Sequence, residues 1–385
     1  MQNDLEKSIF DVTSKSSVSV PTLLYHDMKE HVLIMSDLGS LPSILDHFSA
    51  IVGGLSTLLN PAVQLNQAGS VILDSIGEEE KELESFYLQL GTQFGHFFAL
   101  IHSRNTLDVI QRRFGSDSKF PSDPSIEEAV VGWTITQMQN RLNLFPSISA
   151  EFSPKADQLV ERALADARRQ TVEAERAFIH GDAWPSAMLV DPAMQKNSPL
   201  LSVGFIDWEY AKIGRGISSD FAVVSAYFAL MEIAAAFVSE TKISIASNNI
   251  PMYLHKFRNA MVLKYREASC EEDALWQQNL GDGDIPDVLD PRTLVFRSTM
   301  IAHGTEIIRL TLTRRWKCGH TQCSMDSSEL DNEKRHCELL QRMIRYGLWY
   351  LCHAEDSLSE FCSRKNWEKI IAGHGNGYWL LDLFL

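Results

Sequence analysis

The chain has 385 residues, 45% of them apolar and 22% charged, which is ordinary for a globular protein with a large core. Its formal net charge of −15 gives no electrostatic attraction to phosphate backbones or anionic lipids, so we expect neither nucleic acid nor a membrane as a partner. The opening sequence MQNDLEKSIFDVTSKSS lacks the basic start and apolar run of a secretory signal, and the six cysteines show no disulfide rhythm. These features favour a cytoplasmic location for the protein.

The N-terminal part contains two short strand patterns. TLLYHD and HVLIMSDL, separated by the polar turn MKE, predict an antiparallel pair within residues 18–38. Apolar residues then recur at helical spacing over residues 78–103, with acidic residues crowding the first turns. We therefore predict a small strand-bearing lobe over residues 1–77 and a large helical lobe over residues 78–385.

The large lobe has one further strand pattern among its helices. AMLV and LLSVGFIDW predict a strand pair within residues 187–208. The most apolar stretch, residues 221–238, is slightly short for a bilayer span and contains Glu232, so a buried helix is favoured. The other predicted helices cover residues 125–145, 157–178, 251–268, 293–316 and 332–356. The predicted fold class is α+β.

A cysteine- and histidine-containing segment follows residue 317. Zinc requires four nitrogen or sulfur ligands, and the segment could supply them. The spacing between the first two cysteines is looser than in the usual zinc knuckle, so a polar loop with incidental cysteines is the favoured interpretation. The candidate ligands are Cys318, His320, Cys323, His336 and Cys337.

Two aspartates carry the strongest chemical signal. Asp182 lies in FIHGDAWPSAMLV, on a turn that Gly181 permits, and Asp207 ends the apolar run SVGFI. A hairpin between them would bring both carboxylates to one edge of the protein. Phosphoryl transfer uses such a pair, because one carboxylate can accept the proton of an acceptor hydroxyl while the other holds Mg²⁺.

The pattern HGDAWPSAMLV…FIDWEYA closely resembles the aminoglycoside phosphotransferase and choline-kinase-like family, whose fold is protein-kinase-like. The segments VPTLLYHDMKEHVLIMSDLG, LGTQFGHFFALIHS and GRGISSDFA follow in the family's order. The resemblance makes Asp182 the catalytic base, His180 a brace of the catalytic loop, Asp207 the metal ligand and Asp220 a structural residue. It also implies an adenine pocket lined by the backbone of Ile34, Met35, Ser36, Asp37 and Leu38.

The sequence departs from the family pattern in two places. Ala187 stands where the family has an asparagine that helps to hold a second metal ion, and the adjacent Ser186 is a poor substitute. We find no glycine-rich phosphate loop or strand-borne lysine before Val18, where only Glu6, Lys7 and Lys15 are available. We therefore expect a kinase-like fold with a truncated small lobe and an eroded ATP site.

Three functions follow from these observations. The first, which is favoured, is that the large lobe binds or transforms a small metabolite, for example one of secondary metabolism, without ordinary ATP-dependent transfer. The second is a small-molecule O-phosphotransferase, the one alternative that requires Mg²⁺ and ATP. The third is a non-catalytic interaction protein.

The substrate itself is not encoded in any motif. Aromatic residues of the C-terminal region could line an acceptor pocket, although a core position is favoured for them: Trp316, Tyr346, Trp349 and Tyr350. Glu306 and Glu355 could meet a cationic substrate, although a solvated helix face is favoured for both.

Overall fold

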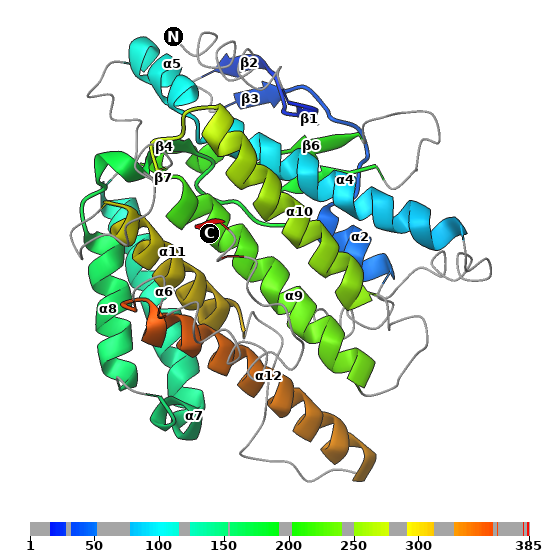
Figure 1. Cartoon of the computed structure of the whole chain (residues 1–385), viewed down its shortest axis with the longest axis vertical. Coiled ribbons are helices and arrows are strands. Elements are labelled where there is room, and N and C mark those ends of the chain that lie inside the picture. The colour runs from blue at the N-terminus through cyan, green and yellow to red at the C-terminus, as the bar shows by residue number, and fades with distance from the viewer. Residues whose placement is uncertain are drawn as a thin grey trace.

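The computed structural model describes residues 16–27, 32–51, 78–114, 124–152, 155–191, 202–240, 250–276, 291–311 and 327–356, together with residues 360, 380, 383 and 384. In these residues, three small sheets lie at one side of a large assembly of helices (Figure 1). The α+β class and the mostly helical large lobe are therefore confirmed. The truncation of the small lobe stays a prediction, because residues 1–15, 28–31 and 52–77 lie outside this part.

Both predicted strand pairs form. The described strands are β1 (Val18–Ser19), β2 (Leu23–Asp27), β3 (Val32–Met35), β4 (Arg176–Ile179), β5 (Met188–Val190), β6 (Val203–Phe205) and β7 (Lys212–Arg215). β2 and β3 pair antiparallel, and so do β5 and β6. β4 pairs antiparallel with β7, which brings segments from both ends of the FIHGD…FIDWEYA region together.

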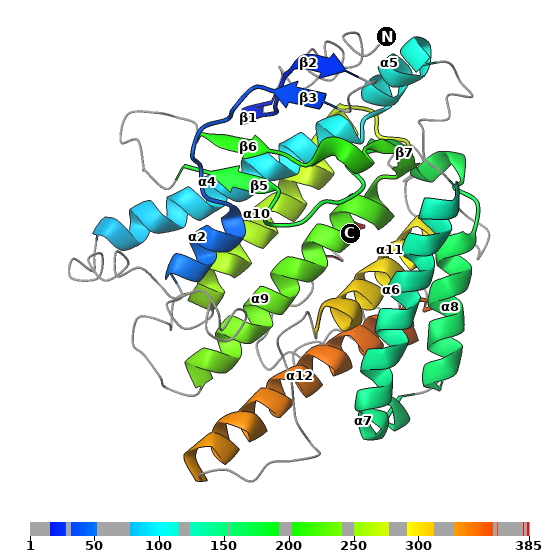
Figure 2. The ribbon, with the colours of Figure 1, turned by 180° about the vertical axis from the view of Figure 1, so that it is seen from behind.

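The N-terminal segment is joined to the large lobe rather than held apart from it. β1 runs parallel to β6, with Val18 opposite Val203, so the three-stranded sheet has the order β1-β6-β5 (Figure 2). Helix α2 (Ile44–Ile51) then buries Phe48, which stacks on Tyr87 and meets Phe257 edge to face. The boundary near residue 77 stays a prediction, since residues 52–77 lie outside the described part.

Most of the long helices form where apolar spacing predicts them. The helices of the large lobe are α4 (Glu78–Ile101), α5 (Arg104–Phe114), α6 (Pro124–Leu144), α7 (Pro146–Ala150), α8 (Ala156–Arg168), α9 (Ala222–Glu240), α10 (Ile250–Glu271), α11 (Pro291–Leu310) and α12 (Ser327–His353). α5 and α7 are not among the predicted helices. α4 and α10 lie side by side in Figures 1 and 2. Gly91 permits this contact, because a Cβ there would lie 2.1 Å from the Phe257 carbonyl oxygen.

The apolar stretch at 221–238 is a core helix, as predicted. Among the described residues, one helical segment, Ile217–Phe237, is long and apolar enough to cross a bilayer, and 83% of its most apolar window is buried inside the protein. Residues 221–238 contain one acidic side chain, Glu232, which is paired with Arg258 at 2.5 Å and with His255 at 3.4 Å, both on α10. The charge is therefore satisfied within the helical lobe.

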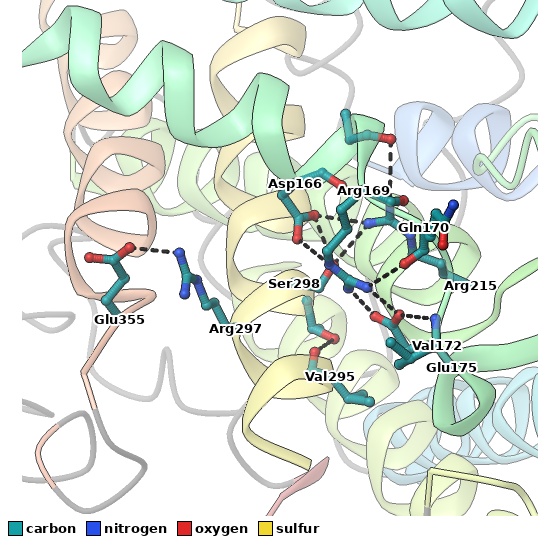
Figure 3. A network of polar contacts seen from close by, with 12 residues as sticks. Asp166, Arg169, Gln170, Val172, Glu175, Arg215, Val295, Arg297, Ser298 and Glu355 are labelled. Carbon is teal, nitrogen blue, oxygen red and sulfur yellow. Dashed lines mark hydrogen bonds and ion pairs between the residues drawn. The ribbon is translucent and has the colours of Figure 1, made fainter. Parts of the chain in front are cut away.

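The prediction of one helix over residues 157–178 is wrong beyond Arg168. α8 ends there, and a short 3-10 turn (Glu173–Glu175) leads into β4. Figure 3 shows the polar network that ends the helix: Arg215 of β7 donates to the carbonyl oxygens of Asp166 and Arg169, at 2.6 and 2.8 Å. Arg169 in turn donates to the buried Glu175 at 2.7 Å. A cationic side chain that binds the last carbonyls stabilises a helix C-terminus, and Arg215 reaches them only through the tertiary fold.

Candidate active site

The HGD loop follows β4 and depends on a glycine. β4 ends at Ile179, opposite Lys212 of β7, and the chain then turns through Gly181, whose φ is 86°. A Cβ at Gly181 would lie 2.2 Å from the carbonyl oxygen of Tyr210, so no other residue fits without moving the backbone. This turn places Asp182 beside the segment that follows β6.

Asp220 holds the backbone of the loop. Its carboxylate accepts the N–H groups of His180 and Gly181 at 2.6 and 2.8 Å, and its Oδ2 lies 3.3 Å from His102 Nε2. Burial alone would raise the pKa of this carboxyl, but the hydrogen bond and charge of His102 hold it below the usual range. Asp220 is therefore an ionised, fully buried anchor, in agreement with the structural role that the resemblance implies.

His180 connects the two loops that carry the aspartates. Its Nε2 lies 2.7 Å from the carbonyl oxygen of Ile206 and donates to it, so Nδ1 is the acceptor for the Asp182 N–H at 3.3 Å. The buried imidazole also meets Phe205 and Trp208 edge to face, with centroids 4.5 and 4.8 Å away. This geometry suits a brace, since both ring nitrogens are engaged with the backbone.

Asp207 occupies a strained turn at the end of β6. Its backbone lies in the left-handed region, with φ of 67° and ψ of 47°, and its side chain does not cap the 3-10 turn Trp208–Tyr210 that follows. Such a conformation costs about 1–3 kcal/mol in a non-glycine residue and is typical of functional sites. A capping role therefore does not explain Asp207.

The two predicted catalytic carboxylates lie close enough to interact electrostatically. Desolvation raises the pKa of Asp182, the charges of His180 and Arg309 lower it, and Asp207 and Asp220 raise it again, for a net upward shift. The Asp182 side chain is nevertheless exposed to solvent. Within the described residues, no hydrogen bond or ion pair engages its carboxylate, so this group is open to a ligand.

The predicted loss of an amide ligand agrees with the local packing. Ala187 is fully buried between the HGD loop and β5. Its N–H donates to the Trp184 carbonyl and its own carbonyl accepts from Ile206, both at 3.0 Å. A buried methyl group offers Mg²⁺ no oxygen, and the half-buried Ser186 lies on the neighbouring position.

The segment predicted to line the adenine pocket, residues 34–38, lies against the sheet that leads to Asp207. The Ser36 N–H donates to the Thr22 carbonyl at 2.7 Å, and the Asp37 carboxylate accepts the Gly39 N–H at 2.9 Å. Leu38 packs on β6, where its Cδ1 would lie 2.9 Å from a Cβ at Gly204. Ile34 and Met35 belong to β3, and Met35 is exposed. Adenine binding by this segment stays a prediction.

A family model matches part of the chain. Residues 76–240 match the model described as "Phosphotransferase enzyme family". This segment is therefore similar to that family. It includes Asp182, Asp207 and Asp220, so the resemblance predicted from the motifs is confirmed, over less than half of the chain. No curated protein matches the chain in sequence.

Solved structures of glucosamine kinase are similar to the chain at a low level. One, in complex with glucosamine, ADP and inorganic phosphate, has a TM-score of 0.40 and 11% identity, over 90% of this chain and 68% of that one. Crystal form B has a TM-score of 0.41 and 11% identity, over 90% and 69% of the two chains. TM-scores this low do not support a fold assignment. The kinase-like fold is supported instead by the family match over residues 76–240 and by the helices and strands described above.

The candidate site includes residues that no sequence motif predicts. Arg309 interacts electrostatically with Asp182, binds Glu306 and lies over the ring of Trp133. The available signal was the i, i+3 spacing of Glu306 and Arg309 on one helix face. The prediction of a solvated Glu306 is wrong: its side chain is only 12% exposed and is paired with Arg309.

The other acceptor candidates are placed as follows. Tyr346, Trp349 and Tyr350 are buried in the core, which confirms the packing interpretation. Glu355 is exposed and pairs with Arg162 and Arg297, which confirms its solvated position.

Several candidates cannot be placed. Cys318, His320, Cys323, Trp316, Glu6, Lys7 and Lys15 lie outside the described residues, as does the side chain of His336. Cys337 is half-buried and accepts a hydrogen bond from Gln341. The described part contains no group of three or more metal-ligating side chains, and the zinc hypothesis stays a prediction.

Proposed function

We propose that this protein transfers a phosphoryl group to a hydroxyl of a small molecule. The observation that carries the proposal is the state of Asp182: an exposed carboxylate that no described residue binds, fixed by a braced loop beside Asp207. A structural aspartate would be paired, as Asp220 is. An unpaired carboxylate on a rigid loop suits a general base.

The chemistry assigns a role to each of these residues. Asp182 accepts the proton of the acceptor hydroxyl as that oxygen bonds to the phosphorus, and the bond from phosphorus to the leaving nucleotide breaks. A raised pKa improves a carboxylate as a base at neutral pH, provided that it remains ionised. His180 and Asp220 keep the carboxylate in position by holding the loop backbone.

The described residues fit one divalent cation better than two. Asp207 is partly exposed, does not cap the turn that follows it and lies at the end of β6, so it can supply an oxygen ligand. Ala187 cannot supply a second one. Magnesium held by Asp207 would neutralise charge on the donor phosphates, and the backbone of residues 34–38 would bind the adenine.

The test compares carboxylate variants of the full chain. Asp182→Asn should reduce phosphate transfer from Mg-ATP to a hydroxylated acceptor by at least a hundredfold and leave nucleotide binding intact. Asp207→Asn should abolish the rise in melting temperature produced by Mg-ATP. Asp108→Asn, an exposed aspartate on α5, is the matched control and should change neither. Unchanged transfer in Asp182→Asn would overturn the proposal.

A second candidate function is favoured by Ala187. Without the second metal ligand, the protein would bind or transform a metabolite through Asp182 and not use ATP. Turnover of a metabolite that requires Asp182, together with no effect of Mg-ATP on the melting temperature, would support this candidate. A scaffold role would follow if neither carboxylate affected any measured activity. In each case we propose a cytoplasmic protein with a small-molecule ligand.

A further inference from the structure

A polar cluster beside Asp182 is not used by the proposed proton transfer. Arg309 of α11 contacts Glu306, one turn earlier, with Nε and Nη2 both 2.6 Å from Oε2. Burial raises the pKa of Tyr227 on α9, and the charge of the guanidinium opposes this effect. Asp182 interacts electrostatically with all three residues. The cluster therefore borders the position where an acceptor hydroxyl would meet its base.

The Arg309–Glu306 pair cancels its own charge. The two side chains are only 14% and 12% exposed, so solvent screens them weakly. Burial raises the pKa of Glu306, although Arg309 opposes this effect, and burial together with Glu306 raises the pKa of Tyr227 to about 12 even though Arg309 lowers it. Tyr227 is therefore a neutral phenol. A ligand that contacts Glu306, Arg309 and Tyr227 therefore meets polar groups whose charges sum to zero.

An exposed tryptophan continues the cluster towards solvent. The Arg309 guanidinium lies 5.0 Å from the ring centroid of Trp133 on α6, yet Trp133 is 53% exposed. The same helix is tied to β7 by Glu127, which accepts from Lys212 at 2.6 Å, and Lys212 is opposite Ile179. α6 thus lies beside the strand that leads into the HGD loop.

A buried donor lies on the other side of Tyr227. The Trp184 and Tyr227 rings are 6.4 Å apart, and the indole Nε1 of Trp184 is buried with no hydrogen-bond partner among the described residues. An unsatisfied buried donor is destabilising, so an acceptor atom from a ligand would stabilise it. Trp184 is only two residues beyond Asp182.

We propose that Trp133, the Arg309–Glu306 pair and Tyr227 form the acceptor-binding surface, and that the acceptor is an uncharged molecule carrying hydroxyls and an aromatic ring. The ring stacks on Trp133, whose exposed indole offers apolar area at small entropic cost. Within this surface, Glu306 and Arg309 are paired with each other, so it offers neither a free carboxylate to a cationic amine nor a free guanidinium to an anion. The unpaired carboxylate of Asp182, beside the surface, is engaged by the acceptor hydroxyl in the proposed phosphotransfer. This inference rests on the proposed phosphotransfer for its orientation towards Asp182.

The first experiment measures binding of four sugars by calorimetry. Phenyl β-glucoside supplies a neutral aromatic ring, glucose lacks the ring, glucosamine is cationic and gluconate is anionic. Phenyl β-glucoside should bind the full-length protein most tightly, and Trp133→Ala should weaken it about tenfold, whereas Trp133→Phe should retain most of the affinity. Leu144→Ala, at another exposed apolar position of α6, is the control and should have no effect.

The second experiment changes the charge of the surface. Glu306→Gln leaves Arg309 without its counter-charge, so the variant should bind gluconate at least tenfold more tightly than the wild type does. Glu355→Gln, at an exposed ion pair with Arg162 and Arg297, is the matched control and should not change gluconate binding. Tighter binding of glucosamine or gluconate than of phenyl β-glucoside by the wild type would overturn the proposal. So would absence of phenyl β-glucoside binding, or an unchanged affinity in Trp133→Ala.

The outcomes separate this inference from the proposed phosphotransfer. If the wild type phosphorylates a sugar and Trp133→Ala does so with unchanged KM, the surface assignment falls and the phosphotransfer stands. If the four-sugar preference holds but no phosphate is transferred, the phosphotransfer falls and the surface stands.

Discussion

Replacement of Asp220 by asparagine tests how the HGD loop is held. The carboxylate accepts two backbone N–H groups, from His180 at 2.6 Å and Gly181 at 2.8 Å, and it is fully buried. An asparagine keeps one oxygen, so its NH₂ group must face a donor that has lost its acceptor. One charge-assisted hydrogen bond is worth about 1.5–3 kcal/mol, and an unsatisfied buried donor costs a similar amount. We therefore expect a loss of about 2–4 kcal/mol in the free energy of unfolding.

The assay is urea unfolding of Asp220→Asn at pH 7. Asp37→Asn is the matched control, because that carboxylate also accepts a backbone N–H, at 2.9 Å from Gly39, but on the surface. The control should lose less than about 1 kcal/mol, since water can replace the bond. A loss below about 1 kcal/mol in Asp220→Asn would refute the assignment of Asp220 as the anchor of the loop.

The pH dependence of the stability difference between wild type and Asp220→Asn tests the same assignment independently. The pKa of Asp220 is lowered in the folded protein, so its stabilisation is present above the ordinary aspartate pKa of about 3.9 and is lost as the pH falls through the folded value. The difference in stability between wild type and Asp220→Asn should therefore be constant from pH 7 to about pH 5 and shrink below about pH 4. A difference that grew in acid would contradict the ionised state.

Three further predictions concern packing, acid stability and activity. Gly91→Ala should destabilise the protein by more than about 2 kcal/mol, because the new Cβ would lie 2.1 Å from a backbone oxygen. At Gly132 on α6 a new Cβ would have no atom within 4 Å, so Gly132→Ala should stabilise the protein by up to about 1 kcal/mol. Chemical unfolding of both variants measures the two changes. Burial lowers the pKa of His303 to about 3, so the unfolded chain alone takes up this proton below about pH 6.5. His303 alone should then contribute a fall in stability of up to about 1.4 kcal/mol per pH unit down to pH 5, so the slope should be shallower by about that amount in His303→Gln. Activity should be lost on the acid side at a pH above the ordinary aspartate pKa, because the pKa of Asp182 is raised; a pH–rate profile without such a limb would argue against Asp182 as the base.

The sequence alone predicts the elements whose signals are local. The hairpin of residues 22–38, the strand pair around Gly204 and the long helices each carry a periodicity that neighbouring residues determine. The HGD turn is equally local, because Gly181 and Asp182 stand next to each other. The family pattern adds Asp207 and Asp220, although it cannot give their hydrogen bonds.

The tertiary structure decides what depends on distant segments meeting. Helix α8 ends at Arg168 because Arg215, 47 positions later, binds its last carbonyl groups, and β4 becomes a strand because β7 lies beside it. In the same way, Glu306 has the sequence of a solvated helix residue, yet it is largely buried and paired with Arg309, whose guanidinium lies over the ring of Trp133. A helical periodicity shows which residues share a face, but only the packing of α11 against α6 and α9 shows what that face contacts.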